Sequence, residues 1–85
     1  MDQLAIKHHH DAGHGWIEAR RDDVEGWGIA EKLSGYSYQN GDKIFLEEDC
    51  DAAKYLEAVR AQGFDYTIVE VNDGDYSRIR SYQQY

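Results

Sequence analysis

The sequence has no proline and only one cysteine, Cys50, among its 85 residues. A single cysteine cannot form an intramolecular disulfide, and it cannot supply the paired cysteines on which most structural zinc sites rely. Without proline, turns must be made by glycine, asparagine and aspartate, and the chain has eight glycines. A disulfide-stabilised scaffold and a cysteine-based zinc module are therefore excluded.

Long apolar runs are also missing. No stretch approaches the roughly 20 apolar residues that a membrane-spanning helix requires. The first residues, MDQLAIK, lack the basic flank and the apolar run of a secretory signal peptide. We therefore expect a cytoplasmic protein.

Positive charge is scarce, since nine Lys and Arg oppose seventeen Asp and Glu and the formal net charge is −8. Nonspecific binding to nucleic acids and to anionic membranes depends on Lys and Arg, so both are disfavoured. An acidic protein is instead attracted to basic protein surfaces, including surfaces that normally hold nucleic acid. The alternative is that the acidic residues only keep a small protein soluble.

What is present predicts one compact α+β domain over residues 1–85. Apolar residues make up 41% of the chain and include seven Tyr, two Trp and two Phe, which is enough for one core. Apolar periodicity predicts the order β-β-α-β-β-α-β, an antiparallel or mixed sheet with two helices packed on one face. The expected elements are strands at 4–10 and 14–19, a helix at 21–34 that breaks near Trp27, a hairpin within 36–49, a helix at 49–62, a strand at 64–72 and a tail at 76–85.

Two turns are predicted from short polar stretches. Asp11-Ala12-Gly13 is typical of a three-residue loop between the first two strands. Asn40-Gly41 marks the second hairpin, for which we prefer the three-residue loop Gln39-Asn40-Gly41 over a two-residue loop. That register gathers apolar side chains on one face, namely Tyr36, Tyr38, Ile44 and Leu46.

Helix ends are predicted from capping residues. Asp22 or Asp23 is expected to cap the first helix, and Asp49 or Asp51 the second. Gly63 is placed to end the second helix.

Three motifs, HDAGHGW, YSYQNGD and LEEDCDA, together resemble a pattern in small proteins of phages, plasmids and integrated bacterial elements. The likeness spans His10 to Tyr85 and includes a closing stretch rich in arginine and tyrosine. The resemblance carries no established chemistry. It implies a mobile-element protein in the host-cell cytoplasm, a setting in which small acidic proteins often look like inhibitors of bacterial defence, anti-CRISPR proteins included.

All four histidines fall within the stretch KHHHDAGHGW. His8 and His10 are expected to share one strand face, with His14 across the hairpin and Asp11 as an oxygen ligand, so one interpretation is a Zn²⁺ or Ni²⁺ site. The alternative is a polar hairpin in which Asp11 and His14 hydrogen-bond the turn.

A catalytic centre is the weaker interpretation. His14 oriented by Asp11 has the chemistry of a general base, but the nucleophile would have to be Cys50 or a serine. The carboxylates beside Cys50 oppose a low thiol pKa, and its apolar neighbours favour a buried, inert role. No nucleophile elbow or phosphate-binding glycine loop is present.

Two features favour protein binding. A dense acidic block can mimic a row of phosphates, although helix capping and solvation explain part of it. The tail is rich in Tyr and Arg, which dominate interface hot spots, although its tyrosines are equally suited to a strap over the domain's own core. The predicted partner-binding residues are Asp42, Glu47, Glu48, Asp49, Asp51, Tyr76, Arg78, Arg80 and Tyr82.

The sequence therefore favours a non-catalytic, cofactor-free inhibitor that occupies a basic surface as a DNA mimic. The expected partner is a nucleic-acid-binding defence effector of the host, with no direct contact to nucleic acid or membrane, and the protein acts as a monomer or homodimer. The alternative is a metal-binding protein or metal-dependent enzyme accessory centred on His8, His10, Asp11 and His14. A dimeric structural module with an exposed sheet edge is a third possibility.

Overall fold

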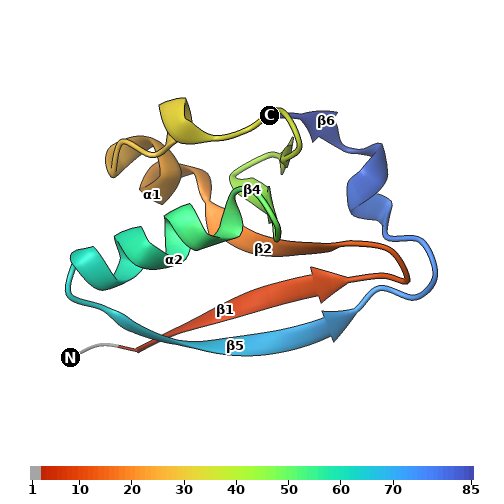
Figure 1. Cartoon of the computed structure of the whole chain (residues 1–85), viewed down its shortest axis with the longest axis horizontal. Coiled ribbons are helices and arrows are strands. Elements are labelled where there is room, and N and C mark those ends of the chain that lie inside the picture. Colours follow the sequence, from red (N-terminus) through yellow and green to blue (C-terminus); the bar gives the residue numbers. More distant parts are fainter. Residues whose placement is uncertain (1–2) are drawn as a thin grey trace.

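The computed structural model describes residues 3–85 and contains one six-stranded mixed sheet with two α-helices over one of its faces (Figure 1). The strand order in the sheet is β5-β1-β2-β4-β3-β6. The α+β class is confirmed. The elements are β1 (Gln3–His10), β2 (Gly15–Arg20), α1 (Arg21–Gly26), the 3-10 helix η1 (Ala30–Lys32), β3 (Tyr38–Asn40), β4 (Lys43–Glu47), α2 (Ala52–Ala61), β5 (Asp65–Asn72), the 3-10 helix η2 (Arg78–Ser81) and β6 (Gln83–Gln84). Among them no helix is long and apolar enough to cross a membrane.

The strand directions bring three strand ends together. β1 pairs with β5 in parallel, whereas β2 pairs antiparallel with both β1 and β4. β1, β4 and β5 consequently run in the same direction, and their carboxyl ends lie at the same end of the sheet. We call this the carboxyl end of the sheet.

The larger apolar core lies between the sheet and the helices. Cross-strand pairs place Ile17 opposite Leu46 and Ala19 opposite Ile44, and all four side chains are buried on this face. Complete burial of one such aliphatic side chain contributes roughly 1.5–3 kcal/mol. The buried residues of this core are Ile6, Ile17, Ala19, Val24, Ile29, Ile44, Leu46, Ala52, Tyr55 and Val59.

A smaller core lies on the opposite face. It consists of Trp16, Phe45 and Ile79, with Tyr38 and Tyr82 packed against it. Ile79 and Tyr82 belong to the C-terminal segment, which turns back over the sheet through η2 before β6 joins its edge (Figure 1). The tail therefore acts as a strap, the alternative that the sequence left open.

The first hairpin has a loop one residue longer than predicted. His10 pairs with Gly15, which leaves the four residues 11–14 in the connection. The Asp11 amide donates to the His14 carbonyl over 3.0 Å, and Asp11 Oδ1 accepts from the Gly13 and His14 amides at 3.0 and 2.9 Å. The predicted turn role of Asp11 is confirmed, whereas His14 takes part through its backbone.

The predicted register of the second hairpin is wrong. Asn40 pairs with Lys43, so the loop is the two-residue turn Gly41-Asp42. Gly41 has φ +61°, which suits glycine at the first central position of a type II′ turn. Tyr38 is opposite Phe45 and faces the smaller core, because the strap gives the sheet a second apolar face.

The helix break near Trp27 is confirmed, and Gly28 with φ +73° provides it. The capping prediction for α1 is wrong, because its N-cap is Arg20. Asp51 occupies the N-cap of α2, as one of the two predicted residues, but its side chain does not cap the helix and is engaged instead by Ser34, Ser37 and Lys54. α2 starts at Ala52, later than predicted. Gly63, with φ +90°, follows its end as expected.

Candidate functional site

Acidic side chains gather at the carboxyl end of the sheet. Glu48 and Asp49 follow β4, Glu70 lies near the end of β5, and Asp75 lies in the turn after β5. All four residues are exposed, and we call them the acidic end. Sequence analysis identified only Glu48 and Asp49, because the strand order that brings the end of β5 to the same place has no local signal.

His8 joins the two halves of the acidic end. Its Nε2 lies 3.0 Å from Glu48 Oε2 and its Nδ1 lies 2.6 Å from Glu70 Oε1. Burial alone would lower the pKa of His8, but the hydrogen bonds to Glu70 and Glu48 and the charges of these carboxylates outweigh it and raise the pKa. His10 Nε2 lies farther from Glu70 Oε1, at 3.7 Å.

Gly15 provides the space for this arrangement. A Cβ atom at Gly15 would lie 2.6 Å from His8 Nε2 and would also overlap the Glu48 carboxylate. Any larger residue there would displace one of the two side chains. The glycine of the HGW part of the first motif is thus explained by the His8–Glu48 pair.

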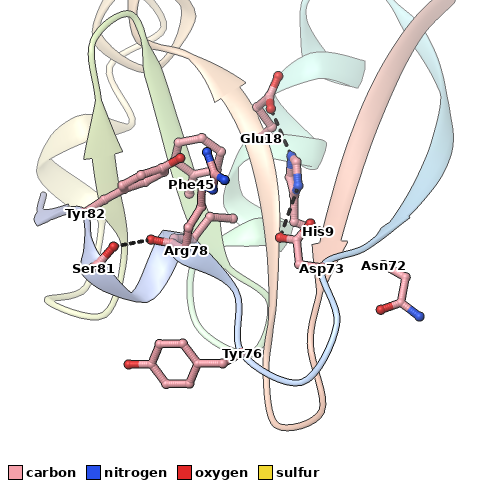
Figure 2. A pocket seen from close by; sticks show the side chains of 10 residues that line it. His9, Glu18, Phe45, Asn72, Asp73, Tyr76, Arg78, Ser81 and Tyr82 are labelled. Atoms are coloured by element: carbon pink, nitrogen blue, oxygen red, sulfur yellow. Dashed lines mark hydrogen bonds and ion pairs between the residues drawn. The ribbon is translucent and has the colours of Figure 1, made fainter.

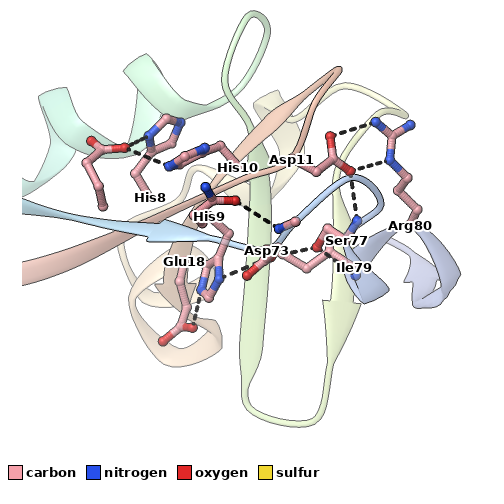
Figure 3. A network of polar contacts seen from close by, with 12 residues as sticks. His8, His9, His10, Asp11, Glu18, Asp73, Ser77, Ile79 and Arg80 are labelled. Carbon is pink, nitrogen blue, oxygen red and sulfur yellow. Dashed lines mark hydrogen bonds and ion pairs between the residues drawn. The ribbon is translucent and has the colours of Figure 1, made fainter.

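His9 points to the opposite face of the sheet and has its own carboxylate partners. Nε2 lies 2.9 Å from Glu18 Oε1 and Nδ1 lies 3.5 Å from Asp73 Oδ2 (Figures 2 and 3). Ser77 Oγ donates to the same Asp73 oxygen over 2.7 Å. A serine nucleophile needs the imidazole beside it, whereas here a carboxylate separates Ser77 from His9. The chain of contacts is suited to holding the strap.

A groove of about 720 Å³ lies beside this network, between the strands and the strap (Figure 2). Phe45 and Tyr82 form its apolar side, with ring centroids 5.3 Å apart. Arg78 is exposed at the groove, and Ser81 Oγ donates to the Arg78 carbonyl over 2.7 Å. Tyr76 is 70% exposed.

Asp11 anchors the strap. The side chain is fully buried, and its carboxylate accepts from Arg80 Nε at 2.6 Å, from Arg80 Nη2 at 2.8 Å and from the Ser77 amide at 2.8 Å (Figure 3). The Arg80 guanidinium and these amide donors hold the pKa of Asp11 far below its usual range. Arg80 in turn lies over the rings of Trp16 and Tyr76, 5.6 and 5.0 Å from their centroids.

Two of the predicted partner-binding carboxylates are buried. Glu47 is 8% exposed, and its Oε2 accepts from the Asp49 and Cys50 amides, each at 2.9 Å. Asp51 is completely buried and accepts from the hydroxyl groups of Ser34 and Ser37. Burial opposes a low pKa for Asp51, but hydrogen bonds from Ser37, Ser34 and Lys54 outweigh it and lower the pKa. We correct the prediction for both: neither carboxylate belongs to the exposed surface.

The other predicted partner-binding residues are dispersed. Asp42 lies in the β3–β4 turn, at the opposite end of β4 from Glu48 and Asp49. Arg80 is engaged by Asp11, and Tyr82 is packed against the smaller core. The contiguous part of the predicted set is reduced to Glu48 and Asp49.

The proposed metal ligands do not converge. His8 contacts Glu48 and Glu70, whereas the Asp11 carboxylate is filled by Arg80 and backbone amides, and His14 lies near Trp16. Within residues 3–85, no three His, Cys, Asp or Glu side chains are arranged to hold a metal ion. The geometry gives the metal interpretation no support.

Cys50 is exposed in the turn before α2, so the predicted burial is wrong. The apolar neighbours Ile44 and Leu46 belong to β4, which ends at Glu47, and Cys50 lies past that end. Partial desolvation, the hydrogen bond with Glu47 and the surrounding carboxylates raise the pKa of the Cys50 thiol. A raised pKa makes this cysteine a poor nucleophile at neutral pH.

Comparisons with known proteins return no match: neither a family model, nor a curated protein, nor a solved structure corresponds to this chain. The resemblance to mobile-element proteins therefore stays a prediction. The function has to be inferred from the acidic end and its surroundings.

Proposed function

We propose that this protein is a non-catalytic binding protein whose acidic end occupies a basic surface on a partner protein. The observation that carries the proposal is the exposure of Glu48, Asp49, Glu70 and Asp75 at one end of the sheet. Within residues 3–85, none of these four carboxylates forms an ion pair with Lys or Arg, although Glu48 and Glu70 contact His8. The charges of Asp49 and Asp75 are thus available to a partner, and those of Glu48 and Glu70 are shared with one imidazole.

The chemistry of such a surface is electrostatic. Like charges concentrated at one end attract a basic partner, raise the association rate and lose effect as salt screens them. The net charge of −8 adds a long-range attraction of the same sign. The engagement of both His9 nitrogens by carboxylates and the raised Cys50 pKa support a binding role over catalysis.

The partner proposed is a nucleic-acid-binding protein. Proteins that hold DNA or RNA expose clustered Lys and Arg, and clustered carboxylates are complementary to them. The resemblance to mobile-element proteins favours a defence effector of the host, which the protein would inhibit in an anti-CRISPR-like manner as a DNA mimic. This mode of action requires no cofactor, and a monomer or a homodimer can perform it.

Charge reversal at the acidic end tests the proposal. Glu48→Lys combined with Asp49→Lys is compared with Glu31→Lys combined with Glu57→Lys, which makes the same charge change at exposed residues of η1 and α2. Each protein is used to capture partners from lysate of its source cells at about 50 and about 500 mM salt. We expect the acidic-end variant to capture about tenfold less partner than the wild-type protein. The control variant is expected to capture as much partner as the wild-type protein.

Heparin extends the same experiment, because it is a polyanion that occupies nucleic-acid-binding surfaces. We expect heparin to release the partner from the wild-type protein. Retention of the partner by the acidic-end variant, together with its loss when His10 and His14 are both changed to Ala, would refute the proposal in favour of the histidine hairpin.

A further inference from the structure

A second cavity, of about 300 Å³, lies next to Asp49 on the face of the sheet that carries the strap. Its volume is at the lower end of the range for ligand pockets and suits one large side chain. It is lined by the aromatic rings of Trp16, Tyr36 and Tyr38, by the carboxylates of Glu47 and Asp49, and by His14, Cys50 and Arg80. We call it the aromatic cavity.

Two residues that line the aromatic cavity carry a buried polar group without its usual partner: among the described residues, the Trp16 indole N–H has no acceptor, and the Glu47 carboxylate has no cation. Trp16 is 2% exposed, and its Nε1 has no hydrogen-bond acceptor among residues 3–85. Buried indole N–H groups normally have an acceptor, because leaving one unpaired is unfavourable. The Glu47 carboxylate is 8% exposed and accepts from the Asp49 and Cys50 amides and from the Cys50 thiol, with no Lys or Arg paired to it in the described part of the chain. A buried carboxylate is normally paired with a cation.

Arg80 also lines the cavity but does not neutralise it. Its guanidinium forms a bidentate ion pair with Asp11, so its charge is already balanced. The cavity therefore retains the negative charges of Glu47 and Asp49. Tyr36, which is 68% exposed, leaves its ring available at the opening.

We propose that the aromatic cavity receives an arginine side chain of the basic partner. A guanidinium is planar, stacks on aromatic rings and donates to carboxylates through a rigid fork of N–H groups. Here Tyr36 and Tyr38 supply the rings, and Glu47 and Asp49 supply the acceptors. This inference rests on the proposed function and names the group that the partner contributes.

Arginine is favoured over lysine by the aromatic walls. The ammonium group of lysine is compact and strongly hydrated, whereas guanidinium is weakly hydrated and buries its flat faces more readily. Arginine is also enriched among the residues that dominate protein–protein binding energy. We therefore expect the cavity to distinguish the two cations.

The test uses N-acetyl-arginine-N-methylamide as the probe and the citrulline analogue as its neutral control of the same shape. The readout is the NMR signal of the Trp16 indole N–H. Trp27, which follows α1 and stacks on Tyr55 of α2 outside the cavity, is an internal reference. We expect the arginine probe to shift the Trp16 signal with a Kd of about 1 mM, as befits a single side chain, and to leave Trp27 unchanged. The citrulline analogue is expected to bind at least tenfold more weakly, by an order-of-magnitude estimate.

Matched variants locate the site. Tyr36→Ala and Asp49→Asn are expected to weaken arginine binding about fivefold to tenfold each. Asp22→Asn removes the same charge at an exposed position of α1, outside the cavity, and is expected to leave binding unchanged. Because all three side chains are exposed, the variants are expected to fold.

Three results would overturn the inference: an unchanged Trp16 signal, equal binding of the citrulline or lysine analogue, or undiminished binding by both Tyr36→Ala and Asp49→Asn. Its failure is separable from that of the proposed function. If the arginine probe does not bind but charge reversal at Glu48 and Asp49 still releases the partner, the proposed function is kept. Only the assignment of an arginine to the aromatic cavity is then rejected. If the probe binds and charge reversal has no effect on the partner, the acidic-end proposal falls.

Discussion

The two faces of the sheet are covered in different ways. On the helix face, ten buried residues form one apolar cluster, whereas on the strap face three buried residues form a smaller one. The strap is held in addition by polar contacts, mainly those of Asp11 with Arg80 and Ser77. The helix face is thus stabilised by buried area and the strap face by a few directional contacts. Regions with few apolar contacts open locally at lower cost, so the strap should detach more easily than the helices.

The largest effect is expected on the helix face. Leu46→Ala removes a fully buried side chain between the sheet and the helices, and we expect a loss of about 3 kcal/mol in the free energy of unfolding. Urea denaturation measures it. Val69→Ala, at a residue that is 45% exposed on β5, is the control and should change stability little. A loss below about 1 kcal/mol for Leu46→Ala would mean that this face is not the main core.

The next effect is expected on the strap face. Asp11→Asn keeps the shape of the side chain but removes the charge that pairs with Arg80. We expect the amides of residues 77–82 to exchange with solvent much faster, while those of α2 remain protected, because only the strap is released. Hydrogen exchange measures the difference, with Asp75→Asn as the control. Equal acceleration in α2 would show that the two faces open together.

A smaller effect on stability is expected at Ser37, a buried residue that makes directional hydrogen bonds. Ser37 is fully buried, donates to Asp51 over 2.5 Å and accepts from the Glu47 amide over 3.1 Å. Ser37→Ala leaves both partners short of one contact, so we expect a loss of about 1–2 kcal/mol. Ser81→Ala, which removes an exposed hydroxyl group, should cost much less in the same denaturation experiment.

The smallest effect is a pH dependence at the acidic end. The pKa of His8 is raised in the folded state, so its contribution to stability is fully present below the pKa of the unfolded chain, about 6.5, and is lost as pH rises through the folded value. Stability should therefore fall as pH increases from this point. His8→Gln should flatten the slope, and His14→Gln should not. If the stability of His8→Gln depends on pH as steeply as that of the wild-type protein, His8 is not the cause of the pH dependence.

The sequence predicts local features of the fold well. The order of strands and helices up to β5, the break near Trp27 and the roles of Asp11 and Gly63 depend on neighbouring residues, and all of them are found. The register of the second hairpin was wrong because a single apolar face was assumed. Tyr38 turns away from Ile44 to reach Phe45, and only the strap makes that face apolar.

The candidate site was less predictable, because it depends on contacts between distant parts of the chain. The parallel pairing of β5 with β1 brings Glu70 to His8, and no spacing in the sequence signals it. Arg80 was assigned to a partner surface, yet it is engaged by Asp11, which precedes it by 69 positions. Glu47 and Asp51 have the same residue types as their exposed neighbours, and only the direction of the backbone decides which carboxylates are buried.

The position of β1 between β2 and β5 has a consequence for synthesis of the chain. Its partner residues on β5 are made 62 positions later, since Gln3 pairs with Asp65. While the nascent chain emerges from the ribosome, one side of β1 keeps unpaired N–H and C=O groups until residues 65–72 have been translated. Messages truncated before that point should yield products that aggregate through this open strand.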